Sequence, residues 1–169
     1  ASAQTIVGAA NHIYDGMHNI IKQLRPGSLD NLGLVETLKD LVNSLQEQHP
    51  DLNINLYLTG NMDALGETLN INLYRIVQES INNVIKHAQA TTLGIDLKLS
   101  DANDLELTIK DDGKGMDIHA IDQTNHFGLL GIRERVQGLH GHFSVDSELG
   151  AGTAINITIP NAIKIGTEE

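Results

Sequence analysis

Hydrophobic residues recur along this chain with two different spacings, and the spacing separates helices from strands. Apolar positions three or four residues apart, the spacing of one helix face, occupy four stretches. Alternation of apolar and polar residues, typical of a strand with one buried face, occupies five others. The pattern predicts helices over residues 5–24, 33–48, 69–88 and 130–139, and strands over residues 53–59, 93–99, 105–109, 142–147 and 153–159.

The order of these elements predicts an α/β two-layer sandwich. Two hairpins, the first turning at residues 101–104, favour a mixed, mostly antiparallel sheet with the helices on one face. The helix over residues 5–24 has one apolar stripe, no obvious local partner, and ends at Pro26 and Gly27. We therefore expect it to lie outside the sandwich beside another helix. The chain after Pro160 is expected to be frayed.

Composition excludes several classes of protein. The 169 residues are 40% hydrophobic but only 3% aromatic, with no Trp, so we expect one core built from aliphatic side chains. A formal net charge of -11 argues against nucleic acid as a partner. The lack of cysteine excludes disulfides and thiolate metal sites. No run approaches the roughly 18–20 apolar residues of a membrane span, so we expect a soluble piece of a longer protein, because the chain starts within a helical pattern and without Met.

The predicted helix over residues 69–88 has a polar stripe opposite its apolar one. Glu79 and Asn83 lie one turn apart and offer hard oxygen ligands suited to Mg²⁺, while Lys86 and His87 could contact phosphates. An ordinary solvated helix face would have the same pattern. The stripe consists of Arg75, Glu79, Asn82, Asn83 and Lys86, with His87 at its margin.

Three glycine-containing segments follow this helix. In residues 111–116 an aspartate ends a strand and two glycines allow close backbone approach to a ligand, although Asp-Gly also forms simple turns. In residues 126–135 glycines lead into a helix, whose N-terminus could bind phosphate oxygens, or they form only a flexible loop. Residues 150–153 could be a plain hairpin turn. No segment is decisive alone.

Together, the order and spacing of these segments resemble the ATP-binding catalytic domain of sensor histidine kinases. Residues 75–88 (R-I-V-Q-E-S-I-N-N-V-I-K-H-A) look like its asparagine box, and residues 111–115 (D-D-G-K-G) match its first glycine box. Residues 128–135 (G-L-L-G-I-R-E-R) resemble a short form of the second glycine box, and residues 150–153 (G-A-G-T) its closing motif.

The resemblance continues upstream and implies a division of the chain. L-R-P at 24–26 and L-G-L at 32–34 are similar to the segment after the dimerisation helices in the nitrate-, hexose-phosphate- and membrane-fluidity-sensing kinases. Residues 1–27 would then be the second helix of the dimerisation and phosphotransfer domain with its connector, residues 28–162 the ATPase domain, and residues 163–169 a tail. The implied fold is the Bergerat sandwich shared with gyrase, MutL and Hsp90 ATPases.

The resemblance also implies that the ligand is Mg-ATP. Asn83 would coordinate Mg²⁺, and Glu79 would hold a metal-bound water or help polarise the phosphoacceptor. Lys86 and His87 would flank the phosphates. Asp111 would read the adenine amino group. The remaining implied site residues are Thr153, which would support Asp111 through water, and Gly113, Gly115, Gly128, Leu129 and Gly131, which would shape the pocket and its lid.

The implied reaction is transfer of the ATP γ-phosphate to a histidine and then to an aspartate of a response regulator. In this family the phosphoacceptor histidine precedes an acidic residue, and neither His12 nor His18 does. We therefore expect this chain to bind ATP without autophosphorylating, and its parent to be a homodimeric inner-membrane protein with this domain in the cytoplasm. The histidines interpreted as surface or loop residues are His12, His18, His49, His119, His126, His140 and His142.

Three other functions remain open. A gyrase- or MutL-type ATPase would need a longer lid than the segment at residues 128–135 provides. An anti-sigma-factor kinase should lack the upstream L-R-P connector and helix. A non-catalytic dimerisation or interaction scaffold would not need the intact Glu79, Asn83 and Asp111.

Overall fold

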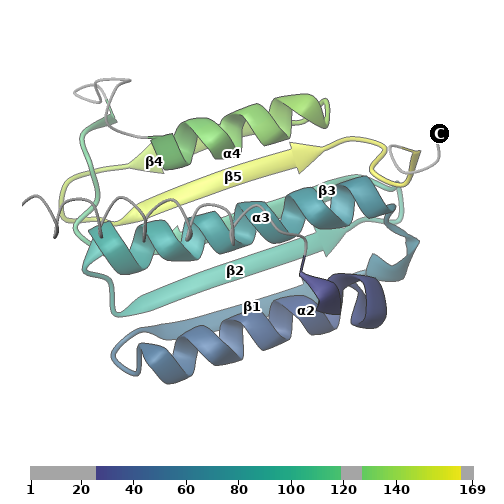
Figure 1. Cartoon of the computed structure of the whole chain (residues 1–169). Coiled ribbons are helices and arrows are strands. Elements are labelled where there is room, and N and C mark those ends of the chain that lie inside the picture. Colours follow the sequence, from purple (N-terminus) through teal and green to yellow (C-terminus); the bar gives the residue numbers. More distant parts are fainter. Residues whose placement is uncertain (1–25, 119–126, 165–169) are drawn as a thin grey trace, which may run out of the picture.

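The computed structural model describes residues 26–118 and 127–164 of the chain. Within these ranges, α-helices cover one face of a five-stranded sheet (Figure 1), as the predicted two-layer sandwich requires. The predicted helix over residues 5–24 lies outside the described residues. The elements in chain order are α2 (Gly27–Gln48), β1 (Asn53–Thr59), η1 (Met62–Ala64), α3 (Glu67–Asn83), η2 (Val84–Ala88), β2 (Thr92–Leu99), β3 (Leu105–Asp111), α4 (Phe127–Gly138), β4 (His142–Ser147) and β5 (Thr153–Ile159).

The sheet has the strand order β1-β2-β3-β5-β4. Only β1 and β2 run parallel, because α3 and η2 cross between them, while the other neighbours are antiparallel. This arrangement confirms the predicted mixed, mostly antiparallel sheet. In the register, Asp111 faces Thr153 and Thr153 faces Ser147, so these three residues form one row across β3, β5 and β4.

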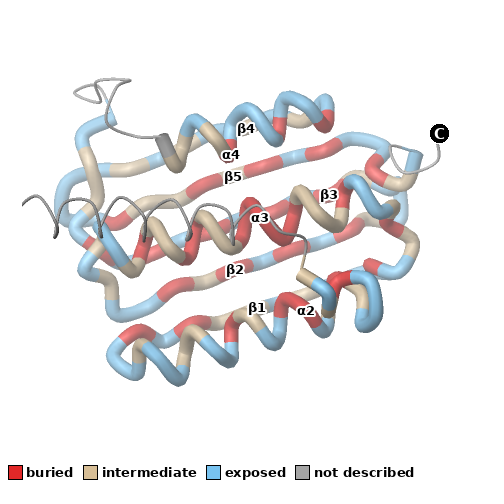
Figure 2. Tube along the Cα trace, in the orientation of Figure 1, coloured by how far each residue is buried: buried red, intermediate tan, exposed pale blue. Residues whose placement is uncertain are grey.

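The core lies between the helices and the sheet face that they cover, as the buried stripes along the strands show (Figure 2). In β2 the buried Leu93, Ile95 and Leu97 alternate with residues that are exposed or half-buried. Full burial of one such aliphatic side chain contributes about 1.5–3 kcal/mol. The side chains of β2 that point the other way, such as Asp96 and Lys98, are exposed, and this alternation holds the site residues of β3 and β5 on the helix side.

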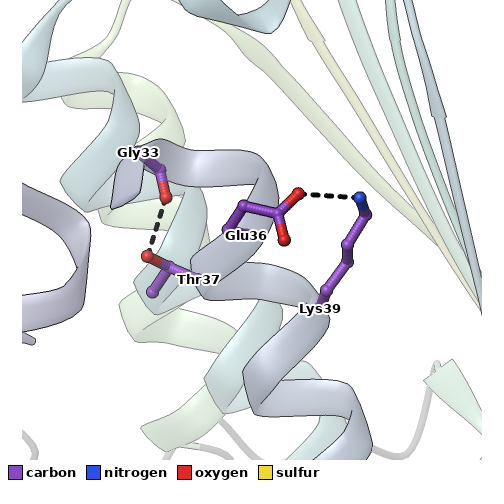
Figure 3. A network of polar contacts seen from close by, with 4 residues as sticks. All are labelled: Gly33, Glu36, Thr37 and Lys39. Atoms are coloured by element: carbon purple, nitrogen blue, oxygen red, sulfur yellow. Dashed lines mark hydrogen bonds and ion pairs between the residues drawn. The ribbon is translucent and has the colours of Figure 1, made fainter. Parts of the chain in front are cut away.

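Helix α2 is interrupted by a kink at Gly33, which has φ 78° and ψ 176°. The buried Thr37 hydroxyl donates a 2.7 Å hydrogen bond to the Gly33 carbonyl, and Lys39 pairs with Glu36 at 2.8 Å on the exposed side (Figure 3). The predicted helix from residue 33 is confirmed. The helical structure begins earlier than predicted, because residues 27–32 form a helical turn before the kink and bury Leu29.

Helix α3 is regular to Asn83 and then continues as the π-helical turn η2, which Gln89 ends in the left-handed region at φ 53°. The sequence predicted one uninterrupted helix over residues 69–88. A π-helical turn inserts an extra residue into the helical repeat, and such turns are frequent at functional sites. The side chains after Asn83 therefore leave the periodicity that the sequence indicates.

Arg75 does not belong to the polar stripe in which the sequence placed it. Its side chain is buried, its Nη1 donates a 2.9 Å hydrogen bond to Oε1 of Gln78, and its guanidinium lies 5.9 Å from the centre of the Tyr74 ring. Burial lowers the pKa of Arg75, an effect that Tyr74 opposes and that the charge of Arg135 on α4 reinforces. Arg75 therefore packs within the helical layer.

The chain just beyond β5 is docked rather than frayed. Asn161 donates its backbone N–H to the Asp104 carboxylate at 3.0 Å, and Ala162, fully buried, donates its own to the Asn103 carbonyl at 2.7 Å. The prediction that the chain is frayed after Pro160 is therefore wrong for residues 161–164. Among the described helices, none combines the length and apolar character needed to cross a membrane.

Candidate functional site

A cavity of about 310 Å³ opens between the helices and the β3–β5 part of the sheet. This volume is at the lower end of the range typical of small-molecule sites. Residues from all four predicted motifs line the cavity, although they are separated by up to 73 positions in the sequence, from Ser80 to Thr153. The predicted site residues that line it are Asn83, His87, Asp111, Gly115, Gly128, Leu129 and Thr153.

Glu79 and Asn83 converge where α4 begins. Both side chains are half-buried, and a Cβ atom placed on Gly128 would lie 2.7 Å from Asn83 Oδ1 and 2.8 Å from Glu79 Oε1. The ends of the carboxylate and the carboxamide therefore both lie against Gly128, and an added side chain there would displace them. The structure thus brings together the two oxygen donors that the sequence proposed for a metal.

Asp111 ends β3 and turns its carboxylate into the buried layer beneath the cavity. Only 6% of the residue is exposed, and Oδ1 accepts a 2.8 Å hydrogen bond from the Gly113 backbone N–H. Burial raises the pKa of Asp111, while backbone hydrogen bonds from Gly113 and Thr153 lower it and the charge of Asp112 raises it further. Asp111 is therefore a buried hydrogen-bond acceptor at the cavity wall.

The next residue, Asp112, points away from the cavity and has a different role. Its carboxylate accepts hydrogen bonds from the Thr91 backbone and hydroxyl and from the Thr92 backbone, at 2.8, 2.7 and 2.8 Å. These bonds, the Thr91 hydroxyl first, lower the pKa of Asp112 to about 2. Asp112 thereby attaches the end of β3 to the segment that follows η2.

The first glycine box packs against the protein's own backbone. A Cβ on Gly113 would collide with the Ala88 carbonyl, and one on Gly115, where φ is 63°, would collide with the Glu148 carbonyl. Lys114 donates its backbone N–H to the Ala88 carbonyl at 2.8 Å and accepts the Gly150 N–H at 2.6 Å. The loop is thus fixed between η2 and the β4–β5 turn.

Some predicted site residues are not at the cavity. Lys86 is exposed on η2 and does not line it, and Glu79, Gly113 and Gly131 do not line it either. The expectation that the glycines of the second box precede a helix is wrong, because α4 begins at Phe127 and includes both Gly128 and Gly131. The π-helical turn explains why only His87 of the Lys86–His87 pair reaches the cavity.

The other histidines fall into two groups. His140 and His142 are exposed and His49 is half-buried at the end of α2, which agrees with their interpretation as surface or loop residues. The remaining ones, His12, His18, His119 and His126, lie outside the described residues.

The sequence reasoning missed the apolar wall and one cation of the cavity. Ile109 and Ile155 lie two positions from Asp111 and Thr153, so the alternation of the strands could have identified them. Lys114 also lines the cavity, within the first glycine box. Across residues 26–118 and 127–164, no group of three or more acidic, histidine or cysteine side chains is placed to hold a metal ion.

Residues 68–163, more than half of the chain, match the family of histidine kinase-, DNA gyrase B-, and HSP90-like ATPases. The chain belongs to this family. Its motifs and the Glu79–Asn83 and Asp111–Thr153 groupings lie within the matched region.

Within the histidine kinase-like ATPases, the sequence relatives are sensor kinases, as the motifs predict. DegS of Bacillus subtilis, a signal transduction histidine-protein kinase/phosphatase, is 33% identical over 140 residues, which cover 80% of this chain and 36% of DegS. UhpB of Salmonella typhimurium, also named a kinase/phosphatase, is 31% identical over 159 residues, which cover 94% of this chain and 31% of UhpB. The chain thus spans about a third of the length of these relatives.

A solved structure shows the same fold. The histidine kinase domain of a blue-light activated kinase from Erythrobacter litoralis superposes with a TM-score of 0.67 at 21% identity, over 80% of this chain and 65% of that one. The predicted histidine-kinase-type sandwich is thereby confirmed.

Proposed function

We propose that this domain binds Mg-ATP in the 310 Å³ cavity and is the nucleotide-binding catalytic part of a two-component sensor histidine kinase. One observation carries the proposal: four motifs far apart in the sequence converge on a single cavity. The Asp111–Thr153 pair offers acceptors suited to an exocyclic amine, while the Glu79–Asn83 pair offers oxygens suited to a cation.

The residues present fit Mg²⁺. Mg²⁺ is usually held by one or two protein oxygens together with waters and substrate phosphates. Asn83 would supply its amide oxygen directly and Glu79 would hold a water of the ion, since the two side chains meet at Gly128. When bound, the ion neutralises phosphate charge. The protein's own contribution is to hold these two oxygens in place along adjacent turns of α3.

For the phosphates, the structure supports His87 more strongly than Lys86. His87 lines the cavity and Lys86 does not. Lys114 also lines the cavity and would add positive charge near its opening, because its side chain is exposed. The small Gly128 and the half-buried Leu129 would form the wall beside them, with Gly131 one turn further along α4.

In the complete protein, we propose that the γ-phosphate passes from ATP to a histidine of the dimerisation region and then to an aspartate of a response regulator. The P–O bond to the β-phosphate breaks as the P–N bond to imidazole forms, so positioning and charge stabilisation are the main demands on this domain. The proposed parent is a homodimer, anchored in the inner membrane by segments outside this chain. The present chain would bind ATP without phosphorylating itself.

Isothermal titration calorimetry with ATP, in the presence and absence of Mg²⁺, tests the nucleotide site. Binding should be saturable and stronger with Mg²⁺, and Asn83→Ala should abolish the difference between the two conditions. Asn72→Ala is the matched control, because Asn72 lies on the same helix, does not line the cavity, and donates its side-chain amide back to the Thr68 carbonyl at 2.8 Å. Absence of ATP binding by the unsubstituted protein would favour the scaffold function instead.

Incubation with γ-labelled ATP tests the phosphotransfer proposal. No label should be retained by the chain alone. An acid-labile, base-stable phosphoprotein would show that a histidine of this chain is an acceptor, and would contradict the proposal.

A further inference from the structure

Ser147, the last residue of β4, lies outside every sequence motif but contacts the closing motif and the residue that follows the first glycine box. Its hydroxyl is 2.9 Å from the Met116 backbone nitrogen, 2.8 Å from the Gly152 carbonyl oxygen and 2.8 Å from the Thr153 hydroxyl. Met116 follows the first glycine box, and Gly152 and Thr153 belong to the closing motif. The half-buried Ser147 hydroxyl thus links the loop after β3 to the start of β5.

The chemistry of a hydroxyl fixes the direction of these three bonds. A serine hydroxyl has one proton and two lone pairs. The Gly152 carbonyl can only accept, so it takes the Ser147 proton, and the Met116 N–H can only donate, so it uses one lone pair. The remaining lone pair accepts the Thr153 hydroxyl proton. Thr153 can therefore offer only lone pairs to a ligand.

Thr153 lines the cavity directly opposite Asp111 in the sheet register. Ionised Asp111 can also only accept hydrogen bonds, and it already accepts the backbone N–H groups of Gly113 and Thr153. Both polar groups at this corner of the cavity are thus acceptors. A ligand group that donates, such as the 6-amino group of adenine, is matched here, whereas a 6-oxo group would face two further acceptors.

We infer that Ser147 is a positioning residue that holds the Thr153 hydroxyl as an acceptor and so contributes to the preference for a 6-amino over a 6-oxo purine. This inference rests on the proposed nucleotide function. Without Ser147, the Thr153 hydroxyl is free to rotate and to donate its proton to a ligand carbonyl. Removal of Ser147 would therefore weaken the discrimination between 6-amino and 6-oxo purines, in addition to any effect on the rigidity of the loops.

The test compares binding of ATP and inosine triphosphate, both with Mg²⁺, by titration calorimetry. Ser147→Ala should weaken ATP binding and lower the ratio of ATP to inosine triphosphate affinity about tenfold, close to the worth of one hydrogen bond. Ser147→Thr, which keeps the hydroxyl, should restore much of the ratio. The control is Ser144→Ala, because Ser144 is exposed on the same strand and faces away from the cavity.

A double-substitution cycle with Thr153→Val separates a role through Thr153 from general support of the loops. If Ser147 acts through Thr153, the double variant should lower the affinity ratio no further than Thr153→Val alone. An unchanged ratio in folded Ser147→Ala, or additive losses in the double variant, would overturn the inference. Should Ser147→Ala not fold, an unchanged ratio in Thr153→Val overturns it equally. Absence of ATP binding by the unsubstituted protein would instead refute the proposed function.

Discussion

The Asp112 carboxylate accepts hydrogen bonds from both the backbone N–H and the hydroxyl of Thr91, at 2.8 and 2.7 Å. The residue before it, Asp111, is buried at the cavity. The two adjacent aspartates at the end of β3 therefore have different roles. One is placed to meet a ligand, and the other holds the strand against the segment that leaves η2.

Asp112→Asn should destabilise the protein at neutral pH, and this effect should vanish in acid. Because the pKa of Asp112 falls from 3.8 to about 2 on folding, its stabilisation is present above pH 3.8 and is lost as the pH falls through about 2. Urea denaturation at pH 7, 4 and 2.5 measures the difference from the unsubstituted protein. Asp101→Asn in the exposed β2–β3 turn is the control, and a difference that persists undiminished at pH 2.5 would contradict the assignment.

Asp111→Asn should weaken ATP binding about 10- to 100-fold without loss of stability, since the hydrogen bond lost is to a charged group. Burial raises the pKa of Asp111, so the ionised carboxylate opposes folding at pH 7, and stability rises as the pH falls through the raised value. The free energy of unfolding of the variant at pH 7 should equal or exceed that of the unsubstituted protein. A loss of more than about 2 kcal/mol would identify Asp111 as a structural residue.

Gly128→Ala should reduce the Mg²⁺-dependent part of ATP binding about tenfold or more. The new methyl group would lie 2.7–2.8 Å from the ends of Asn83 and Glu79, so both side chains must move. The helix itself should not suffer, because alanine favours a helix by about 0.5–1 kcal/mol over glycine. Gly138→Ala, at the end of the same helix and with no atom within 4 Å of the new Cβ, should leave binding unchanged.

Gly33→Ala should destabilise the fold by about 1–3 kcal/mol, because its φ of 78° and ψ of 176° suit glycine almost alone. Thr37→Val should cost about 1 kcal/mol through loss of the bond to the Gly33 carbonyl. Chemical denaturation gives both values. Gly27→Ala is the control, since nothing lies within 4 Å of the added Cβ. Equal stability of Gly33→Ala and Gly27→Ala would show that the kink is not a strained feature.

The elements of this fold are largely readable from the sequence. Alternation along β2, β3 and β5 predicts which residues face the helices, whereas Asp111 and Thr153 were expected at the site because of the motifs that contain them. Helical spacing likewise brings Glu79 and Asn83 together one turn apart. These predictions hold because they depend on the local backbone repeat.

Other features could not be predicted from the sequence, because no local pattern of residues encodes them. The π-helical turn η2 moves Lys86 away from the cavity, and a uniform period of 3.6 residues cannot anticipate it. Arg75 has the sequence context of a solvated residue, yet it is buried among helices because Gln78 and Tyr74 contact its guanidinium.

The sequence by itself determined the helices and strands, the family and most of the residues that carry chemistry, because periodicity and motif spacing are properties of neighbouring positions. The tertiary structure decided which of these residues meet. Ser147 and Met116 are 31 positions apart, and Thr91 and Asp112 are 21 apart. Their contacts depend on strand register and on how loops pack, so only the folded chain specifies them.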